Sequence, residues 1–63
     1  MTWTRRSFYH LDSEHYTICR VNIGARRAYE LWRKSPQKCL ARRWCTTDEE
    51  AAVAVTELKE LAK

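Results

Sequence analysis

Residues 16–34, YTICRVNIGARRAYELWRK, hold two runs of alternating apolar and polar residues on either side of the chain's single glycine. The first run is rich in β-branched residues, and a pair of such runs around a short loop is typical of a β-hairpin. The pattern predicts strands over residues 16–23 and 27–34, closed by Gly24, Ala25 and Arg26. A three-residue loop of this kind keeps the faces of the two strands in phase.

The register of this hairpin decides which side chains face the core. On the side that meets the rest of the protein, it pairs Val21 with Tyr29 and Cys19 with Leu31. On the far side, it pairs Arg20 with Glu30 and Ile18 with Trp32. Gly24 is the first residue of this loop, whereas the left-handed position of a three-residue loop is usually the last.

The clearest helix signal is TTDEEAAVAVTELKELAK, residues 46–63. Thr47 and Glu50 have the spacing of a capping box, in which each side chain satisfies a backbone N–H of the other residue. The acidic residues directly after Thr47 favour the positive end of the helix dipole. One apolar face at helical spacing follows, made of Ala51, Ala54, Val55, Leu58 and Leu61. We expect a helix over about residues 48–62 with one side on a core.

Two further strands complete the predicted sheet, one over about residues 6–11 and one over about residues 40–45. A four-residue turn, DSEH, joins the first of them to the hairpin and sets Phe8 opposite Cys19 and Tyr9 opposite Ile18. The economical fold class is α+β, in a single domain over residues 1–63. It consists of an antiparallel three- to four-stranded meander sheet with one C-terminal helix packed on one face.

The chain has 63 residues, and a domain of this length buries only about 60% of the surface that its unfolded chain exposes. A deep catalytic cleft is hard to build on so small a core. The three cysteines, Cys19, Cys39 and Cys45, are odd in number and lack a zinc-binding spacing, and free cysteine is commonly a core residue. A Cys–His pair with His10 or His15 lacks a pocket to hold a substrate. We therefore expect no enzyme, no catalytic residue, no metal site and no cofactor.

The formal net charge is +4, from 12 Lys and Arg against 8 Asp and Glu. Ten of the basic residues precede residue 44, whereas five of the acidic residues follow residue 47. This distribution suits a polyanion, most often nucleic acid, or an acidic protein surface, and it equally suits a solvated surface that keeps the protein soluble. No apolar run is long enough to span a bilayer and no signal peptide is recognised, so we expect a cytoplasmic protein with no membrane partner.

A single helix covers one face of the sheet and leaves the far face for binding. The predicted binding residues are Tyr9, Ile18, Arg20, Asn22, Arg26, Trp32, Lys34, Arg42 and Trp44. An apolar patch with a charged rim usually marks a binding surface, and Trp, Tyr and Arg are enriched at interface hot spots. In an alternative, Trp3 and the first residues fold back over the rings as a second small core. The facing of the last strand also stays open, because either Trp44 or Cys45 can point toward the helix and each choice brings an arginine with it.

Cations beside aromatic rings suit nucleic acid, because the cations neutralise phosphates and the rings stack on unpaired bases. Strands can also lie in a major groove, where Arg and Asn read base edges. Glu30 in the middle of the face disfavours this function unless Arg20 or Arg42 neutralises it. The first hypothesis is a non-enzymatic protein that binds nucleic acid or a nucleoprotein complex. The alternatives are a stoichiometric inhibitor that binds an acidic or nucleic-acid-binding protein of a host defence complex, and a homodimeric structural module.

Residues 16–55, YTICRVNIGARRAYELWRKSPQKCLARRWCTTDEEAAVAV, resemble the arm-binding domain of phage and transposon integrases, whose architecture plant AP2-type DNA-binding domains share. The closest local match, CTTDEEA, is similar to the family's aromatic-x-Thr-x-Glu-Glu-Ala hinge, with Cys45 where the family prefers an aromatic residue. The resemblance implies a sheet in the major groove with the helix behind it. It implies DNA-facing positions for Arg20, Asn22, Trp32 and Arg42. In size and style the chain also resembles stand-alone phage or mobile-element proteins, which include anti-CRISPR inhibitors and act in the cytoplasm of the host cell.

Overall fold

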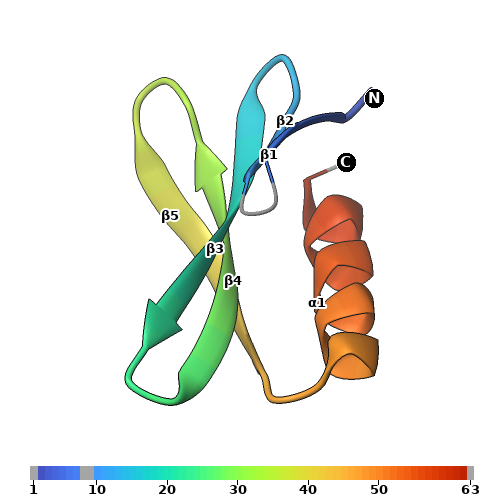
Figure 1. Ribbon diagram of the computed structural model, residues 1–63. Helices are drawn as coiled ribbons and strands as arrows, with labels where there is room; N and C mark the ends of the chain where they lie inside the picture. Colours follow the sequence, from blue (N-terminus) through green and yellow to red (C-terminus); the bar gives the residue numbers. More distant parts are fainter. Residues whose placement is uncertain (1, 8–9, 63) are drawn as a thin grey trace.

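The computed structural model describes residues 2–7 and 10–62 and has five strands and one helix (Figure 1). The elements in chain order are β1 (Thr4–Ser7), β2 (His10–Asp12), β3 (Tyr16–Ile23), β4 (Arg26–Arg33), β5 (Lys38–Cys45) and α1 (Asp48–Leu61). The strands form one antiparallel meander sheet in the order β1-β2-β3-β4-β5, and α1 packs across β4 and β5. The predicted α+β class with a C-terminal helix is confirmed, although the sheet has five strands rather than three or four.

The β3–β4 hairpin has a two-residue loop, so the predicted three-residue loop is wrong. Ile23 pairs directly with Arg26, and Gly24 at the first loop position has a φ of 62°. Glycine at the first central position is what a type II′ turn requires, and such turns suit the right-handed twist of hairpin strands. The pairing therefore slips by one residue, with Ile18 opposite Leu31 and Arg20 opposite Tyr29.

This one-residue slip inverts β3, because neighbouring side chains on a strand point to opposite faces. Ile18 is only 1% exposed and lies on the helix side, together with Arg20 and Asn22. The prediction that Cys19, Val21 and Ile23 face the core is therefore wrong. The prediction for β4 is right, since Tyr29 and Leu31 face the helix side.

The core lies between the sheet and α1. Its centre is the cluster of Ile18, Leu31, Leu58 and Ala62, against which partly buried side chains pack, namely Trp3, Leu11, Tyr16, Tyr29 and Ala41. Trp3 thus belongs to the helix-side core, so the alternative that folds Trp3 over the far face is wrong. Leu61 is 54% exposed and does not join the buried face of the helix as predicted; Ala62 at the helix end is buried instead.

Where the sequence predicted one N-terminal strand over residues 6–11, the described residues form two short strands, β1 and β2. The pairing of β2 with β3 sets His10 opposite Cys19 and Leu11 opposite Ile18. The predicted partners, Phe8 and Tyr9, lie outside the described residues. Ser13 supports the β2–β3 turn, because its backbone N–H and its hydroxyl both donate to the carbonyl oxygen of Tyr16.

The start of α1 is capped as predicted. Thr47 is the N-cap residue, and its Oγ1 accepts a hydrogen bond from the backbone N–H of Glu50 at 3.1 Å. Glu50 does not complete the box through the backbone of Thr47 but accepts a hydrogen bond from the Thr46 hydroxyl at 2.7 Å. α1 is neither long nor apolar enough to cross a membrane, and no other helix lies among the described residues.

Candidate functional site on the open sheet face

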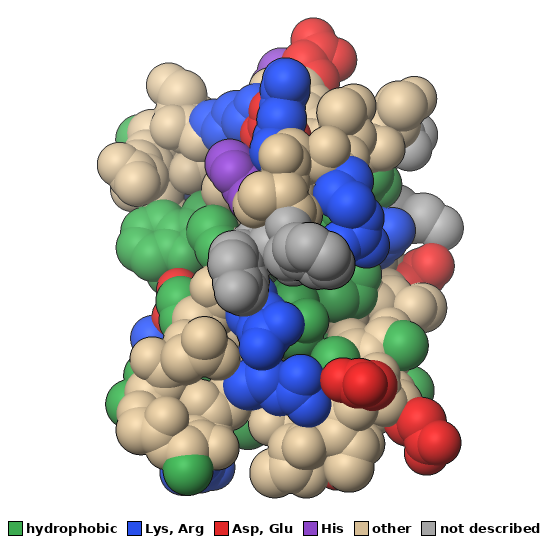
Figure 2. All heavy atoms as spheres, in the orientation of Figure 1, with side chains coloured by type: hydrophobic (Ala, Val, Ile, Leu, Met, Phe, Trp, Pro, Cys, Tyr) green, Lys and Arg blue, Asp and Glu red, His purple; other side chains and the backbone are tan. Residues whose placement is uncertain are grey.

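The side of the sheet opposite α1 carries no described covering element, and we call it the open face (Figure 1). Strand alternation and pairing place a continuous set of side chains there: His10, Asp12, Thr17, Cys19, Val21, Ile23, Arg26, Ala28, Glu30, Trp32, Arg42 and Trp44. Figure 2 shows hydrophobic side chains projecting at the left, the side of the sheet away from α1.

The facing of β5 is settled by burial and by a bulge. Cys45 is buried on the helix side, whereas Trp44 is 41% exposed on the open face. Leu31 pairs with Ala41 and Trp32 with Cys39, so Leu40 is an additional residue in β5 that the ladder skips, as in a β-bulge. Arg43 is on the helix side without being buried, because its side chain extends to the surface, where its Nε donates to Glu57 at 3.1 Å.

Four of the predicted binding residues lie on the open face: Arg26, Trp32, Arg42 and Trp44. Lys34 follows β4 and joins this face at its edge through Asp12. Ile18, Arg20 and Asn22 lie on the helix side, so their predicted position on the far face is wrong, because the two-residue loop inverts β3. Tyr9 lies outside the described residues. Of the four positions that the integrase resemblance implied to face DNA, Trp32 and Arg42 are on the open face.

Trp44 lies beneath two arginines. The guanidinium carbon of Arg26 is 4.2 Å from the centroid of its ring, and that of Arg42 is 5.8 Å away. Both distances fall within the range of cation–π attraction. Neighbouring strands supply the three residues, since Arg26 begins β4 and the other two lie on β5. The result is a cationic cluster around an aromatic ring on the open face.

Glu30 lies at the centre of the open face and is only 6% exposed. Its Oε2 accepts a hydrogen bond from Arg42 Nε at 2.7 Å and also contacts Arg42 Nη2. Its Oε1 accepts a hydrogen bond from Trp32 Nε1 at 3.1 Å. Arg42 therefore neutralises Glu30, which was one of the two possibilities predicted. The buried carboxylate also fixes the indole of Trp32 in position.

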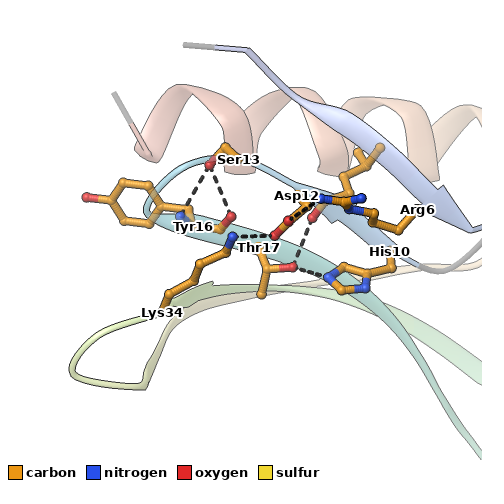
Figure 3. A network of polar contacts seen from close by, with 8 residues as sticks. Arg6, His10, Asp12, Ser13, Tyr16, Thr17 and Lys34 are labelled. Carbon is orange, nitrogen blue, oxygen red and sulfur yellow. Dashed lines mark hydrogen bonds and ion pairs between the residues drawn. The ribbon is translucent and has the colours of Figure 1, made fainter.

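A second polar network lies at the β2 end of the open face (Figure 3). Lys34 Nζ is 2.8 Å from Asp12 Oδ1, and Arg6 Nη2 is 3.4 Å from Oδ2. The hydrogen bond from Lys34, assisted by the charges of Lys34 and Arg6, lowers the pKa of Asp12 below its ordinary value of 3.8. The hydroxyl of Thr17 donates to the Leu11 carbonyl oxygen, so His10 Nε2, which also contacts this hydroxyl oxygen, is the donor in that contact.

The arginines next in sequence to Arg26 and Arg42 point the other way. Arg27 Nη1 donates to Asp48 at 3.2 Å, and Arg43 donates to Glu57. The carboxylates of α1 therefore pair with arginines on the helix side. Figure 2 shows acidic side chains at lower right, near the beginning of α1. Strand pairing and the contacts above place four cations on the open face, Arg6, Arg26, Lys34 and Arg42, against the two carboxylates of Asp12 and Glu30.

A hollow of about 410 Å³ opens on this face between β3 and the end of β4. Its lining residues are Thr17, Cys19, Val21, Glu30, Trp32, Arg33, Lys34 and Gln37. Burial, and to a lesser extent the charge of Glu30, raises the pKa of the Cys19 thiol above its ordinary value. Cys19 is therefore protonated at neutral pH and forms part of the apolar wall.

In the described part of the chain, no group of three or more His, Cys, Asp or Glu side chains is placed to hold a metal ion. Cys19, Cys39 and Cys45 are all free thiols. Comparison of the chain with protein-family models, curated proteins and solved structures found no match.

Sequence reasoning missed Cys19, Val21 and Thr17 as residues of the open face. The signal that could have found them is the position of Gly24. As the first loop residue it fits a two-residue turn better than a three-residue loop, and the shorter loop turns these three side chains away from the helix.

Proposed function

We propose that the protein binds nucleic acid through the open face of its sheet. The observation that carries this proposal is the position of Arg26 over the ring of Trp44, because the ion pairs described for the carboxylates of α1 engage Arg27 and Arg43 instead. A guanidinium over an aromatic ring keeps its charge for a phosphate, and it places that charge beside a ring on which a base can stack. Because Arg42 pairs with Glu30, the charge of this buried carboxylate is compensated within the face.

Charge on this face sets the expected salt dependence. Four cations against two carboxylates leave two net positive charges, which corresponds to about two neutralised phosphates. For duplex DNA the slope of log Kobs against log salt is then about −1.8, which is roughly a tenfold loss of affinity between 50 and 200 mM salt. This is a modest electrostatic contribution, so the rings of Trp44 and Trp32 supply a large share of the affinity.

The experiment is a titration of fluorescently labelled single- and double-stranded DNA with the protein at these two salt concentrations, read by anisotropy. Light scattering establishes the oligomeric state of the same samples. We expect binding that weakens about tenfold with salt and is lost in large part in the Trp44→Ala variant. Failure of a folded, monomeric protein to bind either form at low salt overturns the proposal.

A second candidate function is stoichiometric inhibition of another protein, and the exposed apolar side chains of the open face favour it. Ile23 and Trp44 are both large, and they are 51% and 41% exposed. An interface centred on such residues loses most of its affinity when the ring is truncated and depends little on salt. The salt titration therefore separates the two candidates.

A further inference from the structure

The hollow on the open face has the size and lining of a small-molecule site. Its volume of about 410 Å³ lies within the range of about 300–1,000 Å³ that is typical of ligand pockets. Val21 and Cys19 give it an apolar wall from β3, and Trp32 gives it an aromatic wall from β4. Gln37 and Lys34, from the β4–β5 loop, stand at its edge.

The polar group in this lining that is most deeply buried is the carboxylate of Glu30. An ionised carboxylate only accepts hydrogen bonds and offers about four lone-pair positions. Arg42 contacts Oε2 twice, whereas the hydrogen bond described for Oε1 comes from Trp32 alone. The side chain of Glu30 retains 8% exposure. A donor that enters the hollow can therefore bond to Oε1 beside the indole.

The aromatic wall is fixed before any ligand arrives. The N–H of Trp32 is held by Glu30 at 3.1 Å, and the residue pairs with Thr17 on β3 and Cys39 on β5. A ring held in this way stacks on a flat ligand with little loss of side-chain freedom. The ligand that matches an aromatic wall and one buried acceptor is a flat ring with an amino group.

We infer that the hollow binds one unpaired nucleobase that carries an exocyclic amino group, stacked on Trp32 with its amino group donating to Glu30. This inference rests on the proposed function and narrows it to strands with at least one unstacked base. Cytosine presents an amino donor where thymine presents a carbonyl oxygen. A carboxylate accepts from the first and repels the second, so the hollow favours cytosine.

The test compares three single-stranded DNA oligomers of equal length: all thymine, all cytosine, and thymine with one central cytosine. Anisotropy at neutral pH and low salt gives the Kd of each. Because the inference places one base in this hollow, a single cytosine suffices. We expect it to lower the Kd by about fivefold or more relative to all thymine, the low end of discrimination by a base-edge contact. All cytosine then binds about as tightly as the oligomer with one cytosine, apart from the statistical gain of several equivalent positions.

Two variants make the result specific. Glu30→Gln replaces the acceptor-only carboxylate with an amide that also donates, so the preference for cytosine falls to about one. Val21→Phe fills the hollow from the open face, and it also removes the preference for cytosine. Near-ultraviolet circular dichroism confirms that each variant is folded.

Equal affinity for all three oligomers, or binding to duplex DNA alone, overturns this inference and leaves the proposed function standing. A cytosine preference that survives in Val21→Phe also overturns it, because the base then binds elsewhere. Failure of the folded wild type to bind any DNA overturns the proposed function and this inference with it.

Discussion

The guanidinium carbon of Arg26 lies 4.2 Å from the centre of the Trp44 ring, on the face of the sheet that α1 leaves open. The next residue along the chain, Arg27, donates to Asp48 at the start of α1. Two consecutive arginines thus have opposite roles, one available to a partner and one engaged with the helix. Arg26 also closes the β3–β4 turn, where it pairs with Ile23.

Gly24→Ala tests that turn. Gly24 has a φ of 62°, and an added Cβ meets no atom within 4 Å. The expected loss of about 1 kcal/mol in the free energy of unfolding is therefore conformational rather than steric. Urea denaturation measures it, and Gly24→Asn, which tolerates a left-handed conformation better, loses less. Equal losses for the two variants contradict the turn.

Thr47→Ala removes the side chain that caps α1. Because Thr47 accepts a hydrogen bond from the backbone N–H of Glu50, its loss lowers the free energy of unfolding by about 1 kcal/mol. Thr56→Ala is the control, since Thr56 lies in the exposed middle of α1 and its hydroxyl donates to the Ala52 carbonyl oxygen. Alanine is the better helix former there, so the control loses no stability. A control that loses as much as Thr47→Ala contradicts the capping role.

Arg42→Ala leaves the buried carboxylate of Glu30 without its cationic partner. A buried charged group that loses its partner destabilises a protein by about 3 kcal/mol. The adjacent Arg43 pairs with Glu57, which is half exposed, and such a pair contributes at most about 1 kcal/mol. Chemical denaturation measures the free energy of unfolding of Arg42→Ala, of Arg43→Ala, and of Arg42→Ala combined with Glu30→Gln. We expect the double variant to recover part of the loss; no recovery contradicts the pairing.

Stability at acid pH reports on Asp12. Its pKa is lowered in the folded state by the hydrogen bond from Lys34, so the unfolded chain takes up this proton first as the pH falls. The stabilisation is present above the ordinary value of 3.8 and disappears as the pH falls through the lowered folded value. The difference in unfolding free energy between wild type and Asp12→Asn therefore shrinks from about pH 7 to about pH 2. A difference that is constant over this range rules out the predicted linkage.

The sequence predicted the elements better than it predicted their faces. The cap at Thr47 and the periodicity of α1 are local signals, and the helix bounds agree to one residue. The facing of β3 depends on loop length, because one residue more or less inverts every side chain on the strand. The face of Trp32 was predicted correctly because the apolar pattern of β4 fixed it, whereas the faces of Arg20 and Asn22 were predicted through the loop. The facing of Arg42 on β5 stayed open, because either Trp44 or Cys45 could point toward the helix. The pairing of Arg43 with Glu57 joins residues 14 apart, and no local pattern predicts such a contact.

The most direct test of the central claim is to compare Arg26→Gln with Arg27→Gln in DNA-binding titrations at several salt concentrations. Each variant removes one positive charge. Arg26→Gln removes it from the open face, whereas Arg27→Gln removes it from the helix side. We predict that Arg26→Gln weakens binding and makes the slope of log Kobs against log salt less steep by about one, while Arg27→Gln binds with wild-type slope and affinity. Equal effects of the two substitutions, or a larger effect of Arg27→Gln, contradict the claim that the open face is the binding surface.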